Sequence, residues 1–251
     1  VSGIVLLFLI FIMGSMIFSF LNVVIYRLPR NENFITGRSK CPICGHELTY
    51  LDMVPILSWL ALKKKCRYCG TKISGRYALV EALGGMAAVG CTWVYGFTWH
   101  TLLSFAMCGV LACVAFIDYD TMTIPNGLCI AAAILGFLSI FLTDYCTWYE
   151  HLFGMFAVSL PMLLIAMAVP AGFGGGDIKL MIGCGLYLGW MNAIVAFLSA
   201  VVLGGIWAVC LLAAKKKNRK DTIPFGPSLC IGTAFAMFGG HFLVSWYVSL
   251  L

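Results

Sequence analysis

The chain has 251 residues, of which 62% are apolar and 10% charged, and its mean hydropathy is +0.99. Soluble globular proteins are about 45–50% apolar and about 25% charged, so an ordinary soluble domain is excluded and a lipid bilayer is the expected surrounding. The net charge of +6 does not indicate nucleic-acid binding. Ten of the 16 Lys and Arg residues lie between Arg27 and Arg76 and five between 215 and 220, in blocks that separate apolar runs and that are typical of cytoplasmic loops.

The apolar runs predict eight helices joined by short connections and by one long polar insertion. They cover residues 3–26, 77–96, 100–117, 126–143, 151–170, 178–190, 193–214 and 225–249. A helix needs about 20 apolar residues to cross about 30 Å of hydrocarbon, and the sixth interval is the shortest. Lys and Arg fall only on alternate connections, which predicts both termini outside and the basic connections inside. The sequence therefore indicates an all-α, polytopic membrane protein with about eight transmembrane helices.

The polar insertion divides the chain into three predicted parts: a first transmembrane helix (1–26), a cytoplasmic insertion (27–76) and a transmembrane domain (77–251). Two CxxC pairs lie in the insertion, formed by Cys41, Cys44, Cys66 and Cys69. A glycine follows each pair, which favours two knuckles that bind one tetrahedral zinc ion through four thiolates. Sulfur would fill all four positions, so the zinc would be structural. Disulfides are the alternative, disfavoured on a reducing cytoplasmic side, and His46 is a further potential ligand.

Three of the ten acidic residues occur in unusual contexts. Asp118 directly continues an apolar run, at a predicted helix C-terminus, where the macrodipole disfavours a negative charge. Asp177 follows three consecutive glycines, which permit a backbone to approach another chain closely. Carboxylates at the ends of spans are costly to desolvate, so they indicate function, and two at one depth can share a proton while one activates water. For Asp120, a helix-capping role is an equal alternative.

These motifs together resemble those of the type IV prepilin peptidases, aspartic proteases of the bacterial cytoplasmic membrane. The likeness rests on Ser19–Pro29, the paired CxxC motifs, Gly75-Arg76-Tyr77, the aspartate motif 117–126, the GxGD motif ending at Asp177, and Ile223–Pro227. The resemblance implies that Asp118 and Asp177 are the catalytic pair. At position 126, where relatives often have aspartate, this chain has asparagine, so that position is not expected to be catalytic.

The same resemblance implies a substrate and a second activity. The expected reaction is cleavage of the leader of a type IV prepilin or pseudopilin, after a glycine and at the cytoplasmic face. Many relatives then methylate the new amino terminus with S-adenosylmethionine, and the zinc-type insertion favours this bifunctional version. No dinucleotide-type glycine fingerprint after a strand is visible, so methylation rests on the resemblance alone.

Two questions stay open at the level of the sequence. Intramembrane carboxylates and glycine-broken helices also occur in transporters, so an ion or proton-coupled transporter with a regulatory zinc loop is the alternative function. The clustering of the acids at one face and the lack of a repeat between the two halves argue against it. Glu81 is either a buried partner of Arg76 or part of a second active site. The lysine clusters, such as 63–65, are expected to set topology and to touch anionic lipid, with no nucleic acid as partner.

Overall fold

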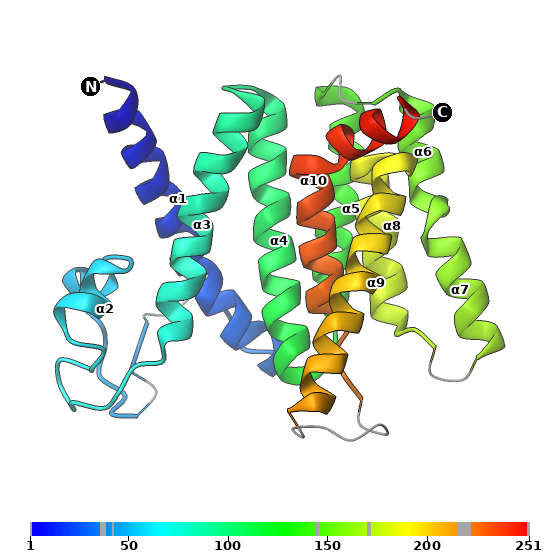
Figure 1. Ribbon diagram of the computed structural model, residues 1–251. Helices are drawn as coiled ribbons and strands as arrows, with labels where there is room; N and C mark the ends of the chain where they lie inside the picture. The colour runs from blue at the N-terminus through cyan, green and yellow to red at the C-terminus, as the bar shows by residue number, and fades with distance from the viewer. Residues whose placement is uncertain are drawn as a thin grey trace. The chain divides into compact units, whose positions relative to one another are not determined.

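The structure is a computed structural model that describes residues 2–35, 39–41, 43–143, 146–169, 172–214 and 222–249. The basic block 215–220, predicted to lie in a cytoplasmic loop, falls outside the described residues. Within the described part the secondary structure is helical, apart from two isolated β-bridges. The helices are α1 (Ser2–Arg27), α2 (Leu57–Ala61), α3 (Gly75–Tyr95), α4 (Trp99–Thr121), α5 (Asn126–Leu142), α6 (Trp148–Ala157), α7 (Ser159–Ala168), α8 (Gly175–Leu188), α9 (Trp190–Ala213) and α10 (Gly226–Val248), with short 3-10 helices η1 (Leu28–Arg30) and η2 (Tyr50–Met53) (Figure 1).

All eight predicted intervals are helical. Among the described residues, six helical segments are long and apolar enough to cross a membrane, while α5 and α8 are shorter than a full span. The predicted interval 151–170 is two helices, α6 and α7, interrupted at Val158. Pro161 explains the interruption, because proline lacks the N–H that would bond to Ala157 and its ring clashes with that carbonyl. The described part of the chain is thus all-α and multi-pass, as predicted.

Packing divides the chain into two compact units, residues 1–97 and 98–251. In the first unit α1 packs along α3 at small residues. A Cβ on Gly14 would lie 2.5 Å from the carbonyl oxygen of Gly84, so both helices need glycine where they cross. The insertion emerges between the ends of these two helices. The functional division of the chain at 76/77 stays a prediction.

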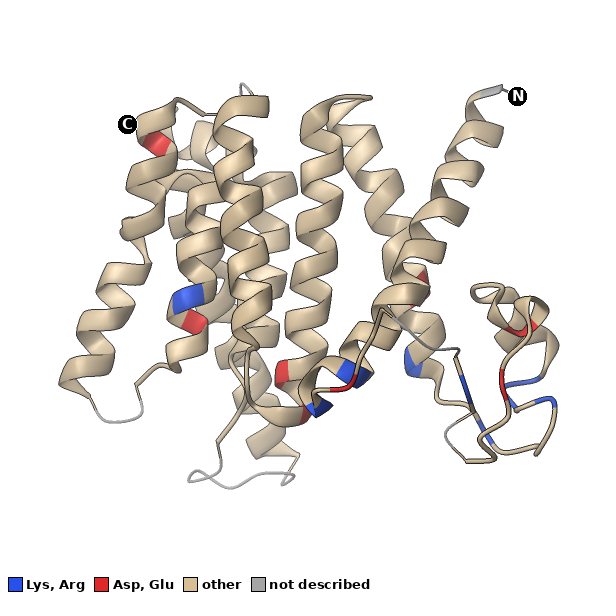
Figure 2. Ribbon diagram, turned by 180° about the vertical axis from the view of Figure 1, so that it is seen from behind, with Lys and Arg blue, Asp and Glu red and all other residues tan. Residues whose placement is uncertain are grey.

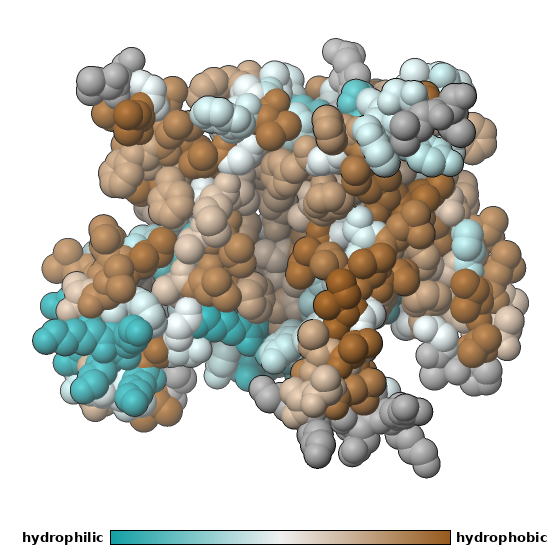
Figure 3. Space-filling model, viewed as in Figure 1, coloured by the Kyte–Doolittle hydropathy of each residue, from teal (hydrophilic) through white to brown (hydrophobic). Residues whose placement is uncertain are grey.

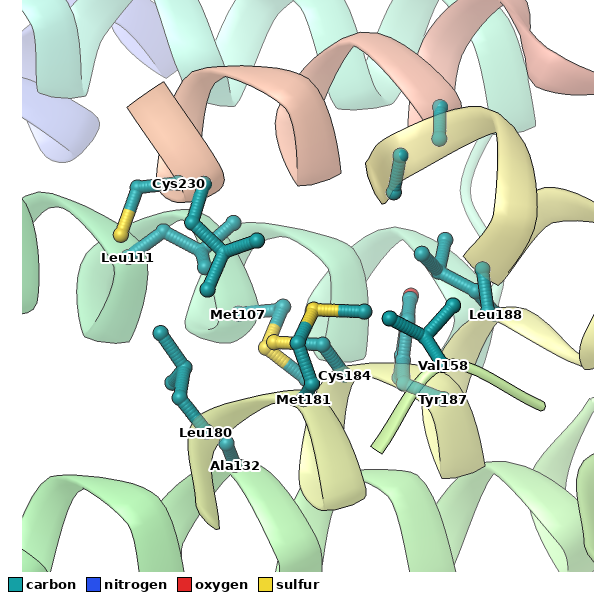
Figure 4. Packing of buried hydrophobic residues seen from close by; sticks show 14 of the residues in the cluster. Met107, Leu111, Ala132, Val158, Leu180, Met181, Cys184, Tyr187, Leu188 and Cys230 are labelled. Atoms are coloured by element: carbon teal, nitrogen blue, oxygen red, sulfur yellow. The ribbon is translucent and has the colours of Figure 1, made fainter. Parts of the chain in front are cut away.

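The second unit is organised around α8. Ten of its 14 residues are buried, since α5, α6, α7, α9 and α10 all contact it. Figure 4 shows the apolar cluster that surrounds it, in which Leu180, Met181 and Cys184 of α8 lie among side chains such as Met107 and Leu111 of α4. A short helix enclosed on all sides needs no lipid-exposed length of its own, which explains why 14 residues suffice.

The outer faces of the long helices carry exposed apolar side chains. In the most apolar window of α9 only 11% of the residues are buried inside the protein. Brown, hydrophobic side chains accordingly cover the helical surface in the view of Figure 3. Lipid tails are the natural contact for such surfaces, and helix association there depends on close packing of small residues.

Candidate active site

Asp118 lies in the last turn of α4, which ends at Thr121. The helix continues beyond the predicted end at residue 117, as far as Thr121. It ends there because Met122 adopts a left-handed conformation (φ 52°), and the Met122 N–H donates to the carbonyl of Asp118 over 2.8 Å. The Asp118 side chain is buried, with 6% of its surface exposed. The backbone N–H of Gly226 donates to Asp118 Oδ2 over 3.0 Å.

Gly226 begins α10, so its N–H belongs to the positive end of that helix. The macrodipole of α10 therefore offsets the unfavourable position of Asp118 at the negative end of α4. A Cβ at Gly226 would lie only 2.6 Å from Asp118 Oδ2, which restricts this position to glycine. The sequence contained this residue within a family-like segment, Ile223–Pro227, but no local signal linked it to Asp118.

Asp177 lies in the first turn of α8 and is also buried, at 9% exposed. Its Oδ1 atom is buried and has no hydrogen-bond partner in the described protein. The preceding glycines have distinct roles: a Cβ on Gly174 would approach Asp177 Oδ2 to 3.0 Å, and one on Gly176 would approach the Ile124 Cβ to 2.9 Å. The close backbone approach that these glycines predicted is thus an approach within this chain.

The two aspartates lie at one end of the second unit and interact electrostatically. Figure 2 marks the acidic positions in red near the C-terminal end of α4 and the N-terminal end of α8. Asp120, by contrast, is exposed. Lys179 Nζ donates to Asn126 Oδ1 over 3.0 Å, which joins the starts of α8 and α5 beside Asp177. The structure therefore brings Asp118 and Asp177 together and leaves Asp120 at the surface.

An aromatic contact holds the two loops that supply the site. The ring of Phe173 lies 5.8 Å from that of Phe225 and 6.0 Å from that of Phe197, between ring centroids. Phe173 precedes the glycines of the Asp177 motif and Phe225 precedes Gly226, so this tilted aromatic cluster joins the two loops. Sequence reasoning missed these positions, because isolated phenylalanines are common in an apolar chain.

The first unit carries the predicted metal site. The Sγ atoms of Cys41, Cys44, Cys66 and Cys69 all lie within 4.8 Å of one another, and all four cysteines are free of disulfides. The Cys41 and Cys69 sulfur atoms are 3.9 Å apart. A tetrahedral ion with Zn–S bonds of about 2.3 Å requires sulfur atoms roughly 3.8 Å apart. The donor set and spacing fit a structural zinc ion.

The two CxxC segments form matching knuckles. The N–H of Gly45 donates to Cys41 O over 2.9 Å, and the N–H of Gly70 donates to Cys66 O over 3.0 Å. Both glycines have φ near +70°, which only glycine adopts easily. The matching backbone aims both sulfur pairs at one point. The His46 ring lies against that of Tyr68, with centroids 3.6 Å apart, and the ligand cluster consists of the four cysteines.

The close packing of the four sulfur atoms makes the pKa values of these thiols differ from one another. Hydrogen bonds with Thr71 lower the pKa of Cys69 to about 6. A backbone hydrogen bond with His46 lowers the pKa of Cys44, but desolvation and the neighbouring Cys41 and Cys69 outweigh it and raise this pKa to about 11. Four thiolates this close repel one another unless a positive ion lies between them.

Glu81 links the insertion to the helices of the first unit. Its side chain is 9% exposed and accepts hydrogen bonds from Ser19 Oγ of α1 over 2.7 Å and from the backbone N–H of Ile56 over 2.8 Å. A buried carboxylate with two such donors is satisfied, and its contacts are those of a structural link.

Comparison with known proteins identifies relatives along nearly the whole chain. A family model described as the bacterial peptidase A24 N-terminal domain matches residues 12–95, and one described as the type IV leader peptidase family matches residues 105–209. These two matches follow the two compact units. The "Prepilin leader peptidase/N-methyltransferase" of Aeromonas salmonicida is 32% identical over 97% of this chain and 94% of its own length. The protein of that name from Bacillus subtilis is 30% identical, covering 98% and 99%. No solved structure matches the chain.

Proposed function

Because this chain belongs to the type IV leader peptidase family, we propose that it is a membrane-embedded aspartic endopeptidase that removes the leader of type IV prepilins or pseudopilins. The observation that carries the proposal is the burial of Asp118 and Asp177 at one end of the second unit, where their charges interact. The comparisons give no support to the transporter alternative, since the relatives named above are peptidases.

The two carboxyl groups take different roles in this mechanism. We assign Asp118, whose Oδ2 accepts the Gly226 N–H, as the ionised member and the general base. Asp177 Oδ1, buried without a protein donor, is suited to carry the shared proton. A water molecule attacks the scissile carbonyl carbon. Asp118 removes a proton from this water, while Asp177 protonates the carbonyl oxygen. Collapse of the intermediate returns that proton to Asp177, and Asp118 protonates the leaving amine.

The position of the pair also selects the peptide bond. At the end of α4 and the start of α8, the aspartates reach a bond near a membrane surface and not one at the bilayer centre. A helical bond is a poor substrate because its backbone is already paired, so a glycine before the cut helps the chain to unwind locally. We place this end at the cytoplasmic face of the bacterial inner membrane, with the basic leader in the cytoplasm.

Methylation and zinc complete the proposal. The relatives' name couples the peptidase to an N-methyltransferase, so we include methylation of the new amino terminus, with S-adenosylmethionine as methyl donor. The four cysteines would hold a zinc ion that supplies structural cross-linking to the insertion. Since sulfur fills every ligand position, this site offers no place for a reacting water molecule.

Conservative changes of the aspartates test the peptidase mechanism directly. Asp118→Asn and Asp177→Asn should each abolish cleavage of a purified prepilin in detergent, since an amide cannot accept the proton of water or share one. Both variants should insert and unfold like the wild type. Asp120→Asn is the matched control, because this exposed neighbour should retain activity. Cleavage by the Asp118→Asn protein, or loss only at Asp120, would refute the assignment.

A further inference from the structure

The insertion exposes a strip of apolar side chains that its own fold does not use. It is formed by η2, the segment that follows it and α2. The strip consists of Tyr50, Leu51, Met53, Val54, Leu57 and Leu60, of which Tyr50 is 84% exposed and Leu51 69%. Exposed apolar patches of this kind mark surfaces that contact another apolar phase. We call these six residues the apolar strip.

Side chains that alternate with the strip residues, but do not belong to the strip, make specific contacts within the insertion. The Trp59 indole N–H donates to Ile73 O over 3.3 Å, and Asp52 accepts from Thr49 and from Arg67. Leu57 and Leu60, three residues apart, share the opposite face of α2. The insertion is thus ordered around polar and aromatic contacts, and the leucines point away from them.

The strip is also held beside a membrane-spanning helix. Ile56, within the segment that carries the strip, donates its N–H to Glu81, which lies six residues into α3. Six residues of helix correspond to about 9 Å along the axis. Ile56 adopts φ +61°, an unusual conformation for a β-branched residue, which this hydrogen bond helps to hold. Ile56, in the middle of this segment, therefore lies beside the first turns of α3.

Basic residues follow the strip directly. Lys63, Lys64 and Lys65 are exposed, and Lys64 Nζ lies 4.9 Å from the centre of the Trp59 ring. Figure 3 shows hydrophobic side chains over η2 and α2, with hydrophilic ones gathered below them on the insertion. An apolar band with adjacent lysines matches a bilayer surface, where apolar side chains enter about 5–10 Å and lysines meet anionic headgroups.

We propose that the apolar strip inserts into the headgroup region of the bilayer that the protein spans, and that Lys63–Lys65 contact its anionic lipids. Depth, exposure and charge each support the same occupant. The insertion would then be fixed at three points: its two connections to α1 and α3, and the membrane surface. This inference concerns the first unit alone and does not depend on the peptidase assignment.

Hydroxyl-radical footprinting of the wild-type protein in phospholipid vesicles tests the inference without any substitution. Leu51 and Ile43 are each 69% exposed, but Ile43 lies in the first cysteine knuckle, outside the strip. We expect Leu51 to be modified several-fold more slowly than Ile43, since both are aliphatic and equally exposed in the protein. Equal modification of Leu51 and Ile43 in vesicles would overturn the proposal.

Photocrosslinking then identifies what covers the strip. A photoreactive phenylalanine analogue at position 51 should give phospholipid adducts in vesicles, whereas the same analogue at position 43 should give few. Adding phosphatidylglycerol to phosphatidylcholine vesicles should raise the yield at position 51, and changing Lys63, Lys64 and Lys65 to Gln should remove that increase. Adducts with a prepilin in place of lipid would show that the strip docks substrate, and would refute the proposal.

Discussion

At the scale of single residues, the chemistry depends on how one buried carboxylate is tolerated at the wrong end of a helix. Asp118 gains a hydrogen bond from the Gly226 N–H and the favourable macrodipole of α10. Charge-assisted bonds of this kind are about twice as strong as neutral ones. Glycine is needed at position 226 because the carboxylate occupies the space of a side chain.

Gly226→Ala should therefore damage the site without disrupting the fold. The new Cβ would displace the Asp118 carboxylate, and we expect cleavage to slow by about tenfold or more, equivalent to about 1.4 kcal/mol in the barrier. Gly205→Ala in α9 is the control, because an added Cβ there meets no atom within 4 Å. Kinetics of prepilin cleavage compare the two. Normal rates in Gly226→Ala would mean that the contact with Asp118 is not required.

At the scale of elements, α8 carries Asp177 and is positioned by close crossings. It meets α6 where Gly185 faces Gly154, with each backbone carbonyl occupying the space of the other's missing Cβ. Small residues at a crossing let backbones approach, and this close packing strengthens helix association in lipid. The register of α8, and thus the depth of Asp177, depends on this contact.

Gly185→Ala should lower stability, because the added methyl group would overlap the carbonyl of Gly154. Overpacking of this kind costs about 1–3 kcal/mol, so we expect a lower Tm in detergent. At Gly239 an added Cβ would make an ordinary contact of 3.7 Å with Phe235, so Gly239→Ala should leave Tm unchanged or slightly higher. Equal Tm values for both variants would contradict the close crossing.

The insertion is the second element whose integrity depends on one feature, its sulfur cluster. We expect one zinc ion per chain by elemental analysis, and its loss in Cys66→Ser, because Cys66 is a buried ligand. Amide exchange within the insertion should then accelerate before the helices are disturbed. Cys210→Ser, at an exposed cysteine of α9, should keep the metal. If wild-type protein purified under reducing conditions contained no zinc by elemental analysis, the proposed zinc site would be refuted.

At the scale of the whole molecule, topology decides which compartment the aspartates face. The alternation of Lys and Arg between connections predicts that the 118–126 turn lies inside and residues 96–98 outside. Alkaline phosphatase fused after Phe97 should accordingly be active in cells, and the same enzyme fused after Met122 inactive. The reverse pattern would place the proposed active site at the outer face and exclude a cytoplasmic leader as its substrate.

The sequence alone was enough to predict the all-α membrane class, the helical intervals and the four clustered cysteines. These properties follow from local composition and spacing, because hydrocarbon imposes span length and a knuckle needs only neighbouring residues. The pairing of Asp118 with Asp177 was also predictable, through a family resemblance. Their role in catalysis stays a prediction.

The contacts that support these parts become visible only in the folded chain. Glu81 joins Ser19 of α1 to Ile56 of the insertion through two hydrogen bonds. The Gly226 N–H donates to Asp118, which lies more than a hundred residues earlier in the sequence. Neither contact has a local signal, because a single glycine or glutamate in an apolar chain suits many environments. The short length of α8 likewise depends on neighbours, since enclosure by other helices replaces the contact with lipid that sets the length of an ordinary span.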